Sequence, residues 1–74
     1  MGFTMSAKYT AVVQRDGEWW IGWVEEIPGV NSQGKTREEL LDNLRDALEE
    51  MLEMNREDAR AAAKGTYEEV SLTA

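Results

Sequence analysis

The chain has 74 residues, with 15 acidic against 8 basic side chains, a net charge of −7, and neither cysteine nor histidine. This length allows one small domain. The composition excludes disulfides and thiolate metal sites, and it removes the usual general base and the commonest zinc ligand. A negative field repels nucleic-acid phosphates and anionic membrane surfaces, whereas it favours basic partners. Because no apolar run approaches the roughly 20 residues of a membrane span and no signal-peptide pattern opens the chain, we expect a cytoplasmic protein. Because the residues most used in catalysis are missing, we expect that it is not an enzyme.

Three short strands are expected in the first half of the chain, after a disordered or non-native leader at residues 1–7. Their residues are rich in β-branched and aromatic types, which favour strands. The dipeptide Asp16-Gly17 is typical of a tight hairpin, and Pro28-Gly29 is a second turn signal. The three strands, expected to form an antiparallel meander, cover residues 8–15, 18–25 and 30–33.

A capping box marks the start of a long helix. The Thr36 hydroxyl can accept a hydrogen bond from the Glu39 amide, while the Glu39 side chain returns to the Thr36 amide. The apolar positions that follow recur at spacings of three and four, at Leu40, Leu44, Leu48, Met51 and Leu52. The pattern extends to Lys64, with Gly65 as a stop, which would give a helix of about 42 Å. Since the strands span only about 23 Å, we expect a break or bend at Asn55.

The last segment, residues 66–73, is expected to form a fourth strand through Tyr67, Val70 and Leu72. A right-handed crossover by the helix would place this strand at the edge of the sheet, beside the first strand and parallel to it. The expected fold class is therefore α+β, with the order β-β-β-α-β and the helix on one face of the sheet.

Both faces of the expected sheet are apolar, although a single helix can cover only one. Alternation along the second strand separates Trp19, Ile21 and Trp23 from Trp20, Gly22 and Val24. Because Gly22 allows close approach of a helix, we assign the Trp20 and Val24 side to the helix. The other side would expose an apolar patch that is large for a solvated surface. It is either an interface, with a second copy or another chain, or a face that the terminal segments cover.

The remaining candidate groups for chemistry are carboxylates and hydroxyls. The helix carboxylates lie off the leucine stripe, where solvated charges usually sit, and no histidine or paired lysine is present to activate a serine or threonine. Base stacking on the tryptophans would need a surrounding basic groove, which the charge balance argues against. We therefore expect no catalytic, metal-binding or cofactor-binding residues, no cofactor, and no direct contact with nucleic acid or membrane.

The run from Glu26 to Glu49 resembles the HicB-like antitoxin family. Its shared features are the Pro28-Gly29 turn, the cap from Gly34 to Thr36 and the helix that follows. The hairpin before it, with the Asp16-Gly17 turn and an aromatic second strand, also resembles this family, so the resemblance covers residues 8–54. It implies the family fold for residues 8–74, a β-β-β-α-β arrangement that is a truncated relative of the RNase H fold. The first strand lacks the mid-strand aspartate that an RNase H would use, so the likeness is one of fold.

The resemblance also implies a partner. Members of this family pair with HicA-like toxins, which are small basic proteins that cleave mRNA. We therefore expect an antitoxin that binds and occludes such a toxin. The sheet with two apolar faces, of which one helix covers only one, separately predicts self-association to a dimer or higher oligomer. The candidate interface residues are Trp19, Ile21, Trp23, Glu38, Asp42, Asp46, Glu49, Glu50 and Glu53. The alternative is a stand-alone homo-oligomeric small domain with a structural or ligand-binding role and no toxin partner. Which surface would contact a toxin is left open.

Overall fold

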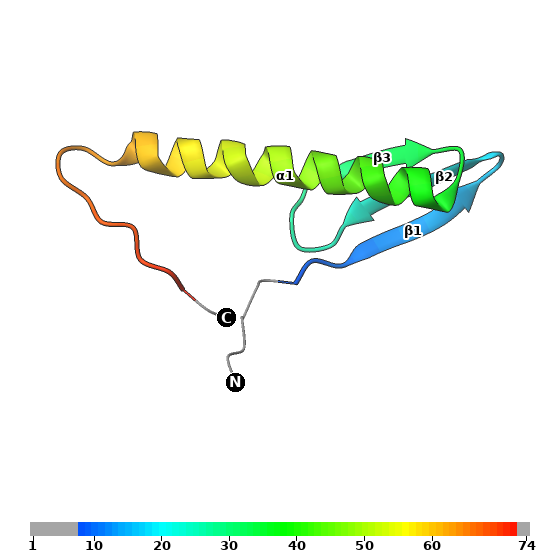
Figure 1. Ribbon diagram of the computed structural model, residues 1–74, viewed down its shortest axis with the longest axis horizontal. Coiled ribbons are helices and arrows are strands. Elements are labelled where there is room, and N and C mark those ends of the chain that lie inside the picture. Colours follow the sequence, from blue (N-terminus) through cyan, green and yellow to red (C-terminus); the bar gives the residue numbers. More distant parts are fainter. Residues whose placement is uncertain (1–7, 73–74) are drawn as a thin grey trace.

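The computed structural model describes residues 8–72 and shows three strands followed by one long helix (Figure 1). Strands β1 (Ala11–Asp16), β2 (Trp19–Val24) and β3 (Asn31–Gly34) form an antiparallel sheet in the order β1-β2-β3. Helix α1 (Arg37–Ala62) packs across one face of this sheet. The α+β class and the three-stranded meander are thereby confirmed, whereas the expected leader lies outside the described residues.

The turn between β1 and β2 is a tight hairpin, as the sequence predicts, although its two loop residues are Gly17 and Glu18 rather than the expected Asp16 and Gly17. Asp16 pairs with Trp19, and Gly17 between them has φ +64°. The expected strand boundaries are less accurate, because β1 begins three residues later than expected and β3 is shifted by one residue toward the helix. Strand ends depend on pairing with neighbours, which local composition does not determine.

Helix α1 begins at the expected cap, with one difference in its hydrogen bonds. The hydroxyl Oγ1 of Thr36 accepts from the Glu39 amide at 3.0 Å, as predicted. The Glu39 carboxylate instead accepts from the Lys35 amide at 2.7 Å, one residue before the expected partner. In both arrangements the Glu39 carboxylate accepts from a backbone amide that has no partner within the helix.

The core lies between the first half of α1 and the helix-facing side of the sheet. Leu40 and Leu44 are buried against Val24 and Val30, and Trp20 packs at the margin of this cluster. The expected assignment of the Trp20 and Val24 side to the helix is thus confirmed. At Gly22, an added Cβ would lie 2.8 Å from the Val12 carbonyl oxygen and 3.1 Å from a methyl group of Leu44. Glycine therefore permits the close contact between α1 and β2.

The expected break at Asn55 does not occur, because α1 is continuous from Arg37 to Ala62. Met51 and Leu52 are the last half-buried residues of the helix, and all residues of the following overhang (residues 53–62) are exposed. Figure 1 shows this part of α1 extending beyond the sheet. Asn55 is therefore not buried, and a polar side chain in a solvated turn gives the helix no reason to bend.

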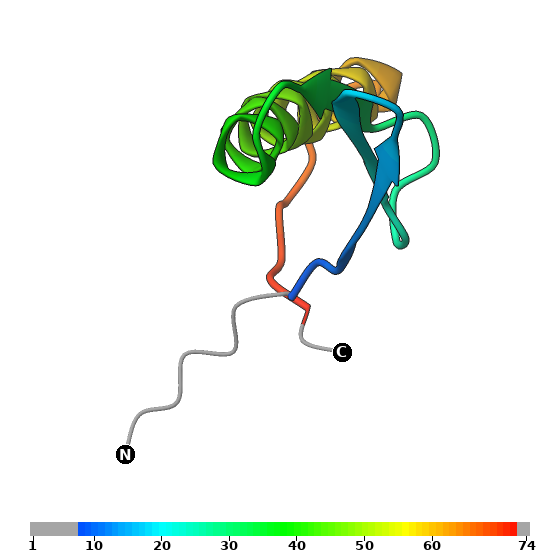
Figure 2. The same cartoon turned by 90° about the vertical axis from the view of Figure 1, so that its right-hand side faces the viewer.

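The expected fourth strand is also absent, since none of residues 66–72 is in a strand and Thr73 lies outside the described part. The unbroken helix is the physical reason. Its ten-residue overhang ends about 15 Å beyond the sheet, so the chain must travel back before it can reach β1. Figures 1 and 2 show the C-terminal segment returning below α1 without lying along β1. In residues 8–72, no helix is both long and apolar enough to span a membrane.

Candidate interaction surfaces

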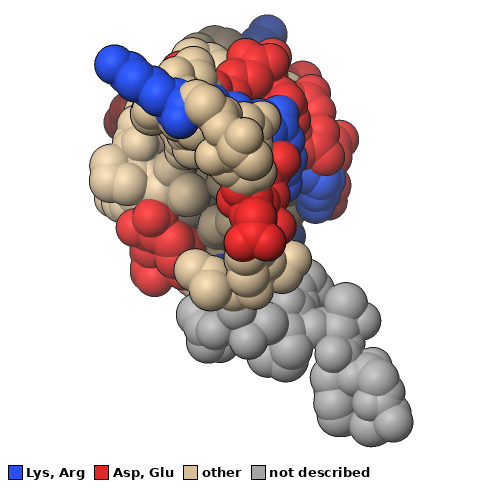
Figure 3. Space-filling model, turned by 90° about the vertical axis from the view of Figure 1, so that its left-hand side faces the viewer, with Lys and Arg blue, Asp and Glu red and all other residues tan. Residues whose placement is uncertain are grey.

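One candidate surface is a stripe of carboxylates on the solvent side of α1. Its members recur at helical spacings of three or four residues, so they lie on one flank of the helix. All six are exposed, and we call them the acidic stripe: Glu38, Asp42, Asp46, Glu49, Glu50 and Glu53. Figure 3, which views the molecule from the overhang end, shows acidic side chains over much of one flank, with basic side chains among them.

The negative charges of two members of the acidic stripe are neutralised by ion pairs with arginines on the same helix. Arg45 lies 3.0 Å from Asp42, and Arg56 lies 3.3 Å from Glu53. Within residues 8–72, the other four members make no ion pair. Because they are exposed, their charges are hydrated and screened by salt, which leaves them available to a basic partner at low cost.

The second candidate surface is the side of the sheet away from α1, which we call the open face. The indoles of Trp19 and Trp23 are 40 % and 41 % exposed, and Ile21 between them is half-buried. The strand register places polar uncharged side chains beside them, because Ile21 is opposite Gln14 on β1 and Gln33 on β3. Charged side chains border the patch at Trp19, because Asp16 is its cross-strand partner and Nζ of Lys35 lies 5.8 Å from the centre of its ring. Exposed aromatic residues of this kind are enriched in protein–protein interfaces.

The structure places the two sets of candidate residues on opposite sides of the molecule. The helix covers one face of the sheet, the acidic stripe points away from that contact, and the open face lies on the far side of the sheet. Figure 2 shows this two-layer arrangement. The nine candidates therefore form two separate surfaces, and one compact partner cannot dock centrally on both.

A third feature was missed by the sequence analysis. Between β1 and α1 lies an open, mainly apolar groove of about 150 Å³, lined by Tyr9 and Ala11 on one side and by Leu41 and Leu48 on the other. Both leucines are half-buried. The available signal was the width of the leucine pattern, since Leu41 lies about 100° around the helix from Leu40 and so broadens the apolar stripe beyond one narrow contact line.

The backbone just before β1 is hydrogen-bonded to the carboxyl group of Glu26. The Thr10 amide donates a hydrogen bond of 2.7 Å to Oε1 of Glu26 and thereby lowers the pKa of that carboxyl below its ordinary value of 4.5. The Thr10 carbonyl accepts from the Glu25 amide at 2.9 Å. This pair of contacts closes the open end of the β1–β2 ladder and has a structural role. Among residues 8–72, no group of three or more acidic side chains is arranged to hold a metal ion.

These features define a small α+β domain with an exposed acidic stripe on its helix and exposed indoles on its sheet. Residues 5–59 match the model of the family described as UPF0150-like. The match spans all three strands and most of α1, and the protein therefore belongs to the UPF0150-like family. No curated protein and no solved structure gives a significant match.

Proposed function

We propose that this protein is a HicB-like antitoxin that binds a basic, HicA-like mRNA-cleaving toxin and occludes its RNA-binding surface. The observation that carries the proposal is the acidic stripe, in which four of six exposed carboxylates make no ion pair with described residues. Membership of the UPF0150-like family and the net charge of −7 support it.

The proposed mechanism is electrostatic occlusion. A toxin that cleaves mRNA must present basic residues to phosphates, and the acidic stripe offers carboxylates to the same groups. From Glu38 to Glu53 the stripe runs for about 22 Å along a rigid helix, a length suited to a patch on a small protein. The charge also accelerates encounter with a basic partner, and it makes binding weaken as salt rises.

The test is co-purification with the product of a neighbouring gene that encodes a small basic protein. We expect a complex at low salt that dissociates as salt is raised, and we expect Asp46→Lys combined with Glu50→Lys to abolish it. The matched control is Glu18→Lys combined with Asp58→Lys, which changes the net charge equally. Glu18 lies in the hairpin, and Asp58 lies on the side of the α1 overhang that continues the buried stripe.

Three outcomes would contradict the proposal: the absence of such a gene, a failure of the two proteins to associate at low salt, or equal weakening by the two double variants. Equal weakening would show that net charge, rather than the acidic stripe, attracts the partner.

A second candidate function is that of a stand-alone homo-oligomer with a structural or ligand-binding role, favoured by the exposed indoles of the open face. It predicts self-association through Trp19, Ile21 and Trp23, without a toxin partner. Sedimentation of the wild type and of Trp23→Glu tests this candidate. A wild type that is monomeric at tens of micromolar, or a Trp23→Glu variant as oligomeric as the wild type, would exclude the open face as the oligomer interface.

A further inference from the structure

The two edges of the sheet differ in how their backbone groups are covered. On the outer edge of β3, Nδ2 of Asn43 donates to the carbonyl oxygen of Gln33 at 2.9 Å, so the helix shields that edge. Just before β1, the carbonyl oxygen of Thr10 accepts from the Glu25 amide and so points toward the β2 side. Hydrogen-bonding direction alternates along a strand, so the backbone groups of Ala11, Val13 and Arg15 point outward. In the described structure β1 pairs only with β2, which leaves this edge available to another strand.

The free edge of β1 borders the apolar groove that Leu41 and Leu48 line. A strand added to this edge would place every second side chain over the groove, because side chains alternate between the faces of a sheet. The edge therefore offers backbone hydrogen bonds and an apolar surface to the same extended segment.

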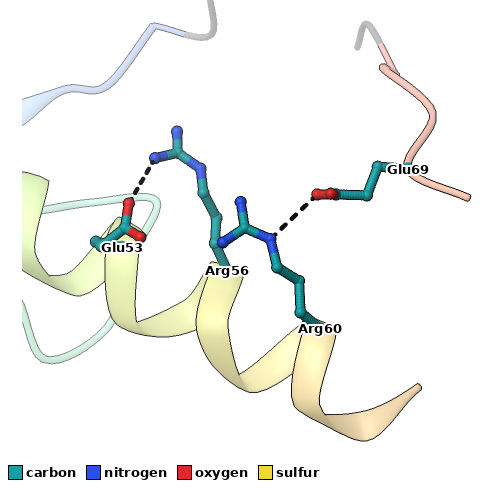
Figure 4. A network of polar contacts seen from close by, with 4 residues as sticks. All are labelled: Glu53, Arg56, Arg60 and Glu69. Atoms are coloured by element: carbon teal, nitrogen blue, oxygen red, sulfur yellow. Dashed lines mark hydrogen bonds and ion pairs between the residues drawn. The ribbon is translucent and has the colours of Figure 1, made fainter. Parts of the chain in front are cut away.

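The C-terminal segment, residues 67–72, has the pattern that such an edge requires. Val70 and Leu72 are 71 % and 91 % exposed, and they alternate with the polar residues Glu69 and Ser71. An ion pair of 3.3 Å between Arg60 and Glu69 connects the segment to the overhang (Figure 4). Tyr67 also lies against the last turns of α1, beside an open hollow. The side chains of Val70 and Leu72 thus lack a packing surface in the monomer.

The length of α1 prevents this segment from lying along the β1 edge of its own chain. Leu48 faces Tyr9 across the groove, and Ala63 lies 15 residues further along, or about 22 Å away. An extended chain needs about seven residues to return over that distance. Even when residues 64–72 are fully stretched, Leu72 is the one residue of the segment 67–72 that reaches the start of β1, and no residue of this segment reaches Val13 or Arg15.

We propose that residues 67–72 of one copy add as a parallel strand to the β1 edge of a second copy, in a reciprocal swap. Strand β1 runs opposite to α1 (Figure 1). If two overhangs lie side by side in antiparallel fashion, each helix points toward the sheet of the other copy. A segment that continues straight beyond its helix then runs along that sheet's β1 in the parallel direction.

The conformational change needed for the swap is small. The chain reverses at Lys64 and Gly65, which are exposed, and Gly65 has φ +82°. Opening this turn releases the Arg60–Glu69 ion pair and the contacts of Tyr67, while the core between α1 and the sheet is unaffected. Two-fold symmetry satisfies both β1 edges at once and closes the assembly at a dimer. This inference does not depend on the proposed antitoxin function, and it uses a surface distinct from the open face.

The test uses the absence of cysteine from the native sequence. Ala11→Cys and Val70→Cys are made in separate full-length proteins, one of which carries a tag that makes it larger. The two proteins are mixed, unfolded together and refolded. The mixture is then treated with a short bismaleimide, which crosslinks neighbouring cysteines. We expect a crosslinked heterodimer about tenfold more abundant than with the control pair, because docked groups react at high effective concentration. The control pair is Gln33→Cys with Val70→Cys, since Gln33 is exposed on the opposite edge strand.

A second variant tests the swap at two side chains that are exposed in the monomer. Val70→Glu combined with Leu72→Glu is expected to make the protein monomeric in sedimentation, whereas Ser71→Glu leaves the dimer in place. The swap is overturned if the mixed single-cysteine proteins crosslink no more than the control pair. It is equally overturned if crosslinking occurs only within one chain of an Ala11→Cys, Val70→Cys double variant.

Discussion

The two halves of α1 share one continuous helical backbone and have opposite surroundings. From Arg37 to Leu52, the helix buries Leu40 and Leu44 against the sheet, whereas every residue of the overhang is exposed. An isolated helix of about ten residues is marginal in water. The first half is therefore stabilised by packing, while the second depends on propagation from the first and on local ion pairs such as Arg56–Glu53. Long-range contacts with the sheet, rather than helix propensity, distinguish the two.

The largest expected contrast is between Leu44→Ala and Met54→Ala. Leu44 is 3 % exposed and Met54 is 56 % exposed, so only the first substitution opens a cavity. We expect Leu44→Ala to lower the free energy of unfolding by about 2–5 kcal/mol and Met54→Ala by less than about 0.5 kcal/mol. Urea denaturation of the three proteins measures both values. Similar losses from the two substitutions would show that the overhang is packed in solution.

The close contact between α1 and β2 is tested by Gly22→Ala. The added methyl group would meet the Val12 carbonyl and the Leu44 side chain, and overpacking of this kind costs about 1–3 kcal/mol. In denaturant melts, Gly22→Ala combined with Leu44→Ala should cost less than the sum of the two single changes, because the shorter side chain in place of Leu44 leaves room for the methyl group. Strict additivity would mean that the Leu44 side chain does not restrict the methyl group and that the clash with the Val12 carbonyl accounts for the cost of Gly22→Ala.

The helix cap should contribute less than the packed half. Thr36→Ala removes the oxygen that accepts from the Glu39 amide, and we expect a loss of about 1 kcal/mol. The same melts that measure Leu44→Ala give the comparison. A Thr36→Ala protein less stable than Leu44→Ala would contradict the assignment of Leu44 to the core.

The smallest expected effect is a pH dependence at Glu26. The Thr10 amide donates to the exposed Glu26 carboxylate and lowers the pKa of this group. The stabilisation of the folded protein by this hydrogen bond is therefore present above the ordinary pKa of 4.5 and is lost as the pH falls through the lowered pKa. Glu26→Gln should therefore be slightly less stable than the wild type at neutral pH, and the difference should shrink in acid. Thermal melts at several pH values measure it, and a difference that grows in acid would reverse the sign.

Local signals predicted most of the fold. The turn at Gly17, the cap at Thr36 and the leucine spacing each depend on neighbours within a few residues, so the strands and the helix start follow from the sequence. The exposure of Asn55 and the continuity of the helix at that position cannot be predicted in this way, because they depend on where the sheet ends beneath the helix. The same missing information led to the prediction of a fourth strand at residues 66–73.

Exposure of the candidate surfaces was predictable for a related reason. Alternation along β2 places Trp19 and Trp23 on the side away from α1, and helical spacing places Asp46 opposite the leucines. The groove beside Leu41 was not predictable, because it exists only where no strand covers the outer edge of β1. Local periodicity identifies which residues share a face, whereas the cover of that face is a property of the whole fold.

The most direct test of the proposed function is the growth of cells that express a small basic protein from a gene neighbouring this one. We expect that protein alone to arrest growth and to deplete mRNA, and we expect co-expression of the wild-type chain to restore both. Asp46→Lys combined with Glu50→Lys should fail to restore growth, although the variant accumulates to the same level, whereas Glu18→Lys combined with Asp58→Lys should succeed. Continued arrest in the presence of wild-type chain, or full rescue by the Asp46→Lys, Glu50→Lys protein, would contradict occlusion through the acidic stripe.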